Sequence, residues 1–371
     1  MNENVVLKIF HAADLHLGLK FQSHPEAQDS LIQARVETLG NLVDQANVMQ
    51  SNILAIAGDL FDRTSIKVSD IQQAVIALNR FEGEVVLVLP GNHDYVTPDS
   101  TLWERFKQEA GENVLVLDKK ESKDLSSYGL NAVVYPAPCH SKHSSENAVK
   151  WIKDTEKASD NIHIGIAHGS IEGVSDFDQR YFPMTKSELE KSGVDIWLMG
   201  HTHITWPDKP GSRDIIFNPG TPEPDGFDCK HEGRAFFHAI DEQKNIQTEI
   251  LSTGTYRFVY SDSDIKSVSD IDQLIDSYKD EQWRRTVLKL KVEGKLEPEL
   301  YEYWKENRQS IRDKVLELKL NDSGVRRKVT PEQIQKEFTE GSFPEQFLSS
   351  FTSEEEEELQ MAYELIKEVQ K

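Results

Sequence analysis

Five short motifs in the sequence carry carboxylate, amide and imidazole side chains, which are the protein ligands of many divalent cations. Each motif directly follows an apolar run with the composition of a β-strand. This repeated placement predicts that the side chains meet in space. In chain order the motifs are His11-Ala-Ala-Asp14-Leu-His16-Leu-Gly18, Gly58-Asp59-Leu-Phe-Asp62, Gly91-Asn92-His93-Asp94, the single residue His168, and Gly200-His201-Thr-His203.

Seven of these side chains form the predicted metal-ligand set, and none of them offers sulfur. Oxygen and nitrogen ligands suit hard or borderline divalent ions, and seven are enough for two ions. We expect Asp59 to bridge the pair. The ligands expected at the first ion are Asp14, His16 and His203, and those expected at the second ion are Asn92, His168 and His201.

Two ions bound side by side suit phosphoester hydrolysis. Held roughly 3.5 to 4 Å apart, they lower the pKa of a shared water, whose hydroxide attacks phosphorus, and they clamp the phosphate oxygens. His93 directly follows a predicted ligand, so we expect it to face the leaving group and to act as general acid. We expect Asp62 to hydrogen-bond to His93, to orient it and to raise its pKa. The predicted catalytic residues are therefore His93 and Asp62.

The elements that must position these motifs alternate between short apolar runs and amphipathic stretches, which is typical of layered α/β architecture. Residues 27–49 repeat apolar side chains at helical spacing. Loops at the carboxyl ends of strands share one edge of an open α/β sheet, where the motifs can converge. The runs expected to be strands are 5–10, 53–57, 85–89, 114–117, 130–135, 162–167, 194–199, 215–217, 235–240 and 246–251.

The pattern changes after residue 255. Strand-like and helix-like stretches between 256 and 322 predict a small α+β domain. Residues 323–328 have the composition of a basic linker, and a helical pattern follows Thr330 and Pro331. The predicted organisation is a catalytic domain over 1–255, an α+β domain over 256–322, and a linker with a helical tail over 323–371.

The charge balance bears on the partners of the protein. The 371 residues include 64 acidic and 42 basic side chains, for a formal charge of -22. This balance argues against nonspecific capture of nucleic acid by a broadly basic surface. The two cysteines, Cys139 and Cys229, have no CxxC partner and fit a reducing cytoplasm. No apolar run approaches the roughly 20 residues of a membrane span, so we expect a cytoplasmic protein without membrane association.

The five motifs, in this order, resemble the signature of the calcineurin-like metallophosphoesterase superfamily, and the resemblance covers residues 5 to 255. Within that superfamily, residues 11–18 and 58–62 are most similar to SbcD-type nuclease subunits and their archaeal and eukaryotic counterparts in double-strand-break repair. The pair Asp62-Arg63 also resembles the Asp-Arg of phosphoprotein phosphatases, in which the Asp supports the catalytic histidine and the Arg binds phosphate. In those enzymes Gly-Asn-His is followed by Glu, whereas this chain has Asp94.

The resemblance implies a four-layer αββα sandwich with two Mn²⁺ ions at the seven ligands. It implies that the α+β domain is a cap that guides DNA to the metals, and that the tail docks on the coiled-coil base of an SMC-like ATPase of the SbcC type. The implied activity is that of a DNA-repair nuclease, with 3'-to-5' exonuclease and single-strand endonuclease action. The chain has no Walker A pattern, so any ATP dependence must come from the partner. A homodimer is left open as a further assembly of this chain.

Alternatives remain for the function. The same ligands suit a phosphoesterase that acts on nucleotides, cyclic nucleotides or phosphoproteins, although the second domain and the tail favour the nuclease. A noncatalytic interaction module is disfavoured by the intact ligand set together with His93.

Alternatives also remain for single residues. His11 either supports the ligands or is a packed core histidine, and His140 and His143 are either ligands or surface-loop residues. Residues Phe343, Phe347 and Phe351 recur every four positions and would line either the core of the tail or a partner surface.

Overall fold

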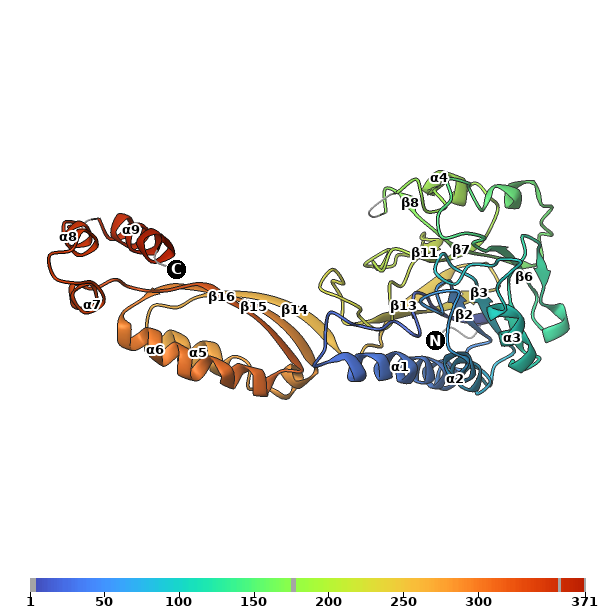
Figure 1. Cartoon of the computed structure of the whole chain (residues 1–371). Helices are drawn as coiled ribbons and strands as arrows, with labels where there is room; N and C mark the ends of the chain where they lie inside the picture. Colours follow the sequence, from blue (N-terminus) through green and yellow to red (C-terminus); the bar gives the residue numbers. More distant parts are fainter. Residues whose placement is uncertain (1–4, 175–177, 353–354, 370–371) are drawn as a thin grey trace. The chain divides into compact units, whose positions relative to one another are not determined.

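The structure is a computed structural model that describes residues 5–174, 178–352 and 355–369. Contacts divide the chain into two compact units, Met1–Phe258 and Val259–Lys371 (Figure 1). Within the described ranges, no helix combines the length and the apolar character that crossing a bilayer requires.

The first unit contains two large sheets. The six-stranded sheet has the order β13-β12-β1-β2-β3-β4, in which β1 to β4 run parallel and β12 pairs antiparallel with both β1 and β13. The five-stranded sheet has the order β11-β10-β7-β6-β5, and only β5 is antiparallel to its neighbour. The strands are β1 Val5–Ala12, β2 Ile53–Ala57, β3 Val85–Leu89, β4 Val114–Val116, β5 Lys123–Asp124, β6 Ala132–Ala137, β7 Ile162–His168, β10 Ile196–Gly200, β11 Ile216–Phe217, β12 Arg234–Asp241 and β13 Ile246–Ser252. Every run that we predicted to be a strand in this unit overlaps one of them.

The layers follow from the alternation of side chains along the strands. In β2, Ile53 and Ala55 pack in the core between the two sheets, whereas Leu54 and Ile56 pack in a separate core with the first three helices. The outer face of the second sheet packs against a third core, which includes Leu189 of α4. The predicted αββα sandwich is therefore confirmed. The helices are α1 Gln28–Val48, α2 Val68–Leu78, α3 Leu102–Glu109 and α4 Lys186–Glu190, with the 3₁₀ helices η1 Ser126–Tyr128 and η2 Lys150–Asp154, and a small sheet joins β8 Ile171–Glu172 to β9 Met184–Thr185.

The second unit is built on the three-stranded sheet β14-β15-β16. Strand β15 alternates strictly: Leu288, Leu290 and Val292 enter the core with the helices, and the residues between them are more exposed. Strand β16 continues to Arg327 and pairs parallel with β15 as far as Leu296, so most of the segment that we predicted to be a linker is strand. The elements are β14 Arg257–Asp264, α5 Val268–Asp276, η3 Glu281–Arg285, β15 Thr286–Leu296, α6 Pro298–Asn307, η4 Arg308–Lys314 and β16 Glu317–Arg327.

Three helices complete this unit: α7 Pro331–Glu337, α8 Phe343–Ser349 and α9 Glu356–Val369. The hydroxyls of Thr330 and Ser342 cap the first two, and each of these helices has Pro in its first turn. The helices share a small core made by Ile334, Phe338 and Leu348.

Candidate metal centre

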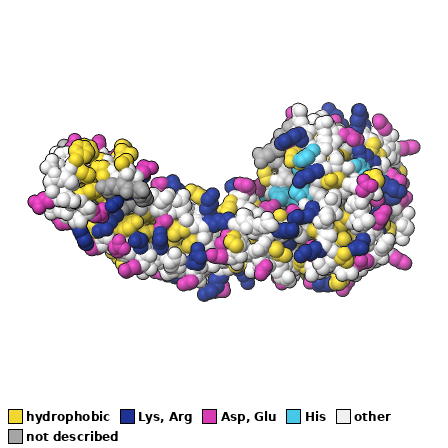
Figure 2. Space-filling view, viewed as in Figure 1, with side chains coloured by type: hydrophobic (Ala, Val, Ile, Leu, Met, Phe, Trp, Pro, Cys, Tyr) yellow, Lys and Arg dark blue, Asp and Glu magenta, His cyan; other side chains and the backbone are white. Residues whose placement is uncertain are grey.

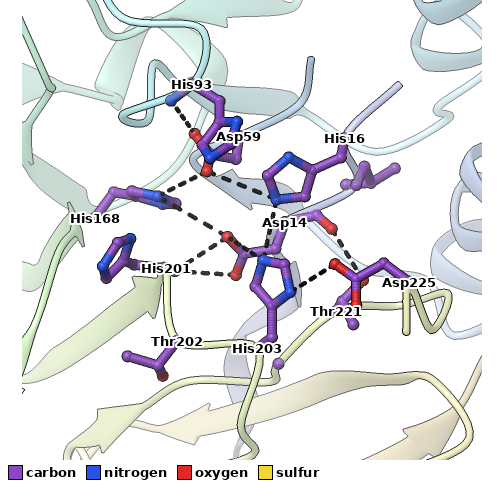
Figure 3. Close-up of polar contacts among 12 residues, drawn as sticks. Asp14, His16, Asp59, His93, His168, His201, Thr202, His203, Thr221 and Asp225 are labelled. Atoms are coloured by element: carbon purple, nitrogen blue, oxygen red, sulfur yellow. Dashed lines mark hydrogen bonds and ion pairs between the residues drawn. The ribbon is translucent and has the colours of Figure 1, made fainter. Parts of the chain in front are cut away.

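The residues predicted as ligands or catalytic groups follow the carboxyl ends of β1, β2, β3, β7 and β10. These strands are neighbours within their sheets, and the two sheets face each other across a common core, so the loops meet at one edge of the sandwich (Figure 3). The structure joins all of the predicted residues in one network of polar contacts: Asp14, His16, Asp59, Asp62, Asn92, His93, His168, His201 and His203.

The backbone of these loops is strained. A positive φ in a residue other than glycine costs about 1–3 kcal/mol and persists only where the surrounding structure enforces it. Here the first two loops hold each other, because the Asp14 N–H donates to Gly58 O at 3.1 Å and the His16 N–H donates to Asp59 O at 2.9 Å. The predicted ligands with positive φ are Asp14 at 58°, His16 at 48°, Asp59 at 51°, His201 at 105° and His203 at 46°.

Two glycines of the motifs make room for the site. A Cβ atom on Gly58, which has a φ of 97°, would lie 2.0 Å from Nδ1 of His168, and one on Gly91 would lie 2.2 Å from Oδ1 of Asp59. Both distances are shorter than any tolerable contact, so only glycine lets these side chains approach the neighbouring loop.

Asp59 lies at the centre of the network. Its Oδ1 accepts the N–H of His93 at 2.8 Å, while its Oδ2 lies 3.2 Å from Nε2 of His168 and 3.7 Å from Nε2 of His16. One carboxylate oxygen thus lies between residues of the two predicted ligand sets. Burial would raise the pKa of the Asp59 carboxyl, but the facing imidazoles hold it below its ordinary value.

The ligands predicted for the first ion lie together. Nε2 of His16 and Nε2 of His203 are 3.0 Å apart, and Oδ1 of Asp14 lies 3.7 Å from Nε2 of His203. The Asp14 carboxylate also accepts the backbone N–H of His201, at 2.9 Å to its Oδ2. Burial raises the pKa of Asp14 and lowers the pKa of His16 well below its ordinary value.

The ligands predicted for the second ion surround Oδ1 of Asn92. This oxygen lies 3.0 Å from Nε2 of His168 and 2.9 Å from Nδ1 of His201. His168 donates its Nδ1–H to Ala57 O at 2.9 Å, which leaves Nε2 to point at the oxygens of Asn92 and Asp59. Burial would lower the pKa of His168, but the Asp59 carboxylate raises it to about 9.

The donor set fits divalent cations. In neutral His168 the Nε2 lone pair faces two acceptor oxygens, and these atoms attract one another only through a proton or a cation held between them. Three groups of acidic and imidazole donors have their atoms within 4.8 Å of one another, and they share members: Asp14 with His16 and His203, Asp14 with Asp59 and His168, and His16 with Asp59 and His93. The first group contains the three ligands predicted for the first ion.

His93 is oriented by a different atom than we predicted. Its Nδ1 donates to the main-chain carbonyl of Asp62 at 2.9 Å, whereas the Asp62 carboxylate pairs with the guanidinium of Arg63. Because a carbonyl oxygen only accepts, this bond holds the Nδ1 proton in place and leaves Nε2 as the nitrogen that exchanges protons. Asp62 therefore orients His93 through its backbone.

Sequence reasoning missed Asp225 and did not single out the role of Thr221. Oδ2 of Asp225 lies 2.9 Å from Nδ1 of His203, and the Thr221 hydroxyl donates to Asp14 O at 2.9 Å (Figure 3). The segment 218–221 follows a strand, as the other motifs do, which marks it as a rim loop. No spacing rule links Asp225 to His203, and only the folded loop brings them together.

Sequence analysis left two alternatives each for His11, His140 and His143, and the structure places each of them differently. His11 is fully buried and its Nε2 lies 3.1 Å from Met199 O, inside the sandwich, so it is a packed histidine. His143 is exposed, and its ring centroid lies 4.9 Å from that of Tyr181. The ring of Tyr181 in turn lies 4.9 Å from that of His201, so a surface loop reaches a predicted ligand through ring contacts. His140 is exposed.

Comparison with known proteins gives a family match over more than half of the chain. The family described as Calcineurin-like phosphoesterase matches residues 7–205. That range contains all of the predicted ligands and both predicted catalytic residues.

Individual relatives also match parts of the chain. An uncharacterized metallophosphoesterase, YhaO of Bacillus subtilis, is 30% identical over 208 residues, which are 53% of this chain and 48% of that protein. The DNA double-strand break repair protein Mre11 of Methanopyrus kandleri is 23% identical over 258 residues, 62% of this chain and 53% of that protein. Mre11 of Saccharolobus solfataricus is 23% identical over 229 residues, which are 59% of this chain and 55% of that protein. The chain spans about half the length of the curated relatives it matches.

Proposed function

The chain belongs to the calcineurin-like phosphoesterase family, and we propose that within this family it is a dinuclear metal-dependent DNA nuclease with 3'-to-5' exonuclease and single-strand endonuclease activity. The observation that carries the proposal is the convergence of seven oxygen and nitrogen donors, five of them buried, with His93 beside them. Such a set suits phosphodiester hydrolysis.

Each side chain has a role in the proposed reaction. The proposed cations are Mn²⁺. When bound, they would neutralise phosphate charge and activate water. Asp59 is the proposed bridge because its Oδ2 lies between His16 and His168. The remaining ligands are Asp14, His16 and His203 at one position and Asn92, His168 and His201 at the other.

His93 is the proposed general acid. Its backbone N–H donates to Asp59 at 2.8 Å and its Nδ1 donates to Asp62 O at 2.9 Å, so one bond holds the backbone of His93 and the other orients its ring. The Nε2 atom can then deliver its proton to the departing sugar oxygen, a step that contributes about 10²–10⁴-fold to rates of this kind.

DNA is the proposed substrate because the Mre11 relatives carry the name of DNA double-strand break repair proteins. The second unit supports this substrate, since hydrolysis of a small ester needs no added α+β domain. The net charge of -22 limits DNA capture by this chain alone. Figure 2 shows acidic and basic side chains interspersed on the visible surface of both units. We therefore propose that a partner supplies basic DNA-binding surface.

The proposed partner is an SMC-like ATPase, and the proposed contact is the phenylalanine stripe of α8. Phe343 is 75% exposed and Phe347 is 39% exposed, whereas the core of the tail is formed by Leu348 and its neighbours. The two phenylalanine rings stack at 5.6 Å, so they present one apolar surface. A homodimer remains a second proposed assembly.

The proposal is tested by presenting the metal-free protein with Mn²⁺ and three substrates: linear duplex DNA, single-stranded circular DNA and bis(p-nitrophenyl) phosphate. We expect all three to be cleaved and all cleavage to be lost in Asp59→Ala. Cleavage of the nitrophenyl ester without any cleavage of DNA would instead support an enzyme that acts on nucleotides, cyclic nucleotides or phosphoproteins.

A further inference from the structure

A polar groove of about 390 Å³ lies between the chain segments that follow Asp62 and His93. Two of its walls continue the loops that carry the predicted catalytic residues: one starts at Thr64, two residues after Asp62, and the other at Tyr95, two residues after His93. The bond between His93 Nδ1 and Asp62 O ties these loops together where the groove begins. The third wall is the start of α3. The groove therefore begins within two residues of Asp62 and of His93, the residue that we assign to leaving-group protonation.

Arg105 supplies the positive charge of the groove. Its side chain lines the groove, is exposed, and has no ion pair or side-chain hydrogen bond with any residue that the structure describes. Five serine and threonine side chains also line the groove, and within the described chain the hydroxyls of Thr64 and Ser65 have no hydrogen-bond partner. The groove thus presents hydrogen-bond donors to an acceptor-rich ligand.

The rest of the lining excludes a simple anion as the best ligand. Ile66, Leu102 and the ring of Tyr95 add apolar surface, which inorganic phosphate does not use. Asp99 adds an exposed carboxylate, which repels a bare anion and requires a donor from the ligand. A nucleotide meets all three demands, because it combines phosphate oxygens, an apolar sugar and base, and amino or hydroxyl donors.

We propose that this groove binds the nucleotide on the leaving-group side of the scissile phosphodiester, with Arg105 on its phosphate and Tyr95 against its base or sugar. The inference rests on the proposed function, since it takes His93 as the acid that marks the leaving-group side. It adds a binding subsite and a substrate requirement: a substrate whose leaving group is a nucleotide is favoured over one whose leaving group is small.

The test compares two substrates that differ in the leaving group. In a short single-stranded oligonucleotide the leaving group is a nucleotide, and in thymidine 5'-(p-nitrophenyl phosphate) it is p-nitrophenol. Loss of one charge-assisted hydrogen bond weakens binding about tenfold or more. We expect Arg105→Ala to lower kcat/KM for the oligonucleotide by about that factor and to leave the nitrophenyl ester unchanged. Arg80→Ala is the matched control, because Arg80 is exposed and pairs with Asp44 just beyond the far end of α2.

A binding measurement separates failure of this inference from failure of the proposed function. In EDTA, where the metal ligands hold no cation, thymidine 5'-monophosphate is titrated into the wild type and Arg105→Ala. Weaker binding to the variant supports the groove even if no DNA is cleaved. Equal binding to both proteins, binding of inorganic phosphate as tight as that of the nucleotide, or equal loss of activity on both substrates overturns the inference.

Discussion

Oδ2 of Asp225 lies 2.9 Å from Nδ1 of His203, on the side of the imidazole opposite to the other predicted ligands. This contact holds one ring nitrogen and leaves Nε2 to face His16, 3.0 Å away. Carboxylates placed in this way fix the orientation of a metal-binding histidine and raise its basicity. Asp225 thus supports the site without contacting the other ligands named above.

Removing this support should weaken metal binding without abolishing it. We expect Asp225→Asn to lower the affinity for Mn²⁺ by about 10- to 100-fold, as measured by calorimetric titration. Asp208→Asn serves as the control, because Asp208 is 74% exposed in its ion pair with Arg234. Unchanged affinity in Asp225→Asn would show that the His203 ring is held by packing alone.

The stability of the fold should depend on pH through the protonated imidazoles of His168 and His203. Burial lowers and the facing carboxylates raise the pKa values of His168 and His203, with a net rise from 6.5 to about 9 for each. A folded-state pKa above the unfolded value stabilises the fold fully below pH 6.5, and that contribution is lost as the pH rises toward 9.

In EDTA we therefore expect Tm to fall between pH 6.5 and 9. The affinity for Mn²⁺ should rise over the same window, because cation and protons compete for the same nitrogens. Differential scanning calorimetry with and without Mn²⁺ checks both trends. A Tm in EDTA that does not change over this window would contradict the assignment of the protons.

The predicted roles of Asp59 in metal binding and of His93 in acid catalysis can be tested separately. Asp59→Ala removes the oxygen between His16 and His168, so bound metal and activity should be lost together. His93→Ala should retain metal and lower kcat by about 10²–10⁴-fold. Metal analysis of the purified variants beside their kinetics makes the comparison, and equal loss of metal in both would show that the roles are misassigned.

Gly58 offers a test of the close approach between loops. Gly58→Ala places a Cβ atom 2.0 Å from Nδ1 of His168, at a φ of 97°. We expect loss of metal binding, because His168 must leave its bond to Ala57 O. Gly129→Ala is the matched control: its φ is 79°, but no atom lies within 4 Å of the new Cβ. Both variants carry about 1–2 kcal/mol of backbone strain, measured by chemical denaturation, so metal loss in both would assign the effect to strain.

The stripe on α8 should be separable from catalysis. We expect the double substitution Phe343→Glu and Phe347→Glu to abolish binding of an SMC-like ATPase from the same organism, since it places charge on an exposed apolar surface. Hydrolysis of bis(p-nitrophenyl) phosphate should not change. Leu348 is buried in the tail core, so Leu348→Glu should instead unfold the tail, because it buries an unpaired charge. Size-exclusion chromatography of the mixtures measures the association, and full binding by the double variant would refute this surface.

The sequence alone was sufficient to predict the sandwich architecture and the polar residues that meet at its edge, although it missed Asp225 and the role of Thr221. Short apolar runs with helical stretches between them are local patterns, and they predicted every strand of the two large sheets except the two-residue β5. Placing Asp14, Asp59 and His168 after such runs was enough to predict their convergence, because the carboxyl ends of parallel strands share an edge.

Tertiary structure alone decided which atoms meet. The main-chain carbonyl of Asp62 orients His93, and Asp225 reaches His203, because long-range packing of the loops sets these contacts and no spacing rule encodes them. The extension of β16 to Arg327 likewise depends on pairing with β15, which a basic and glycine-containing segment does not reveal. Local pattern determines which element forms, whereas the partner of a side chain depends on residues far away in the chain.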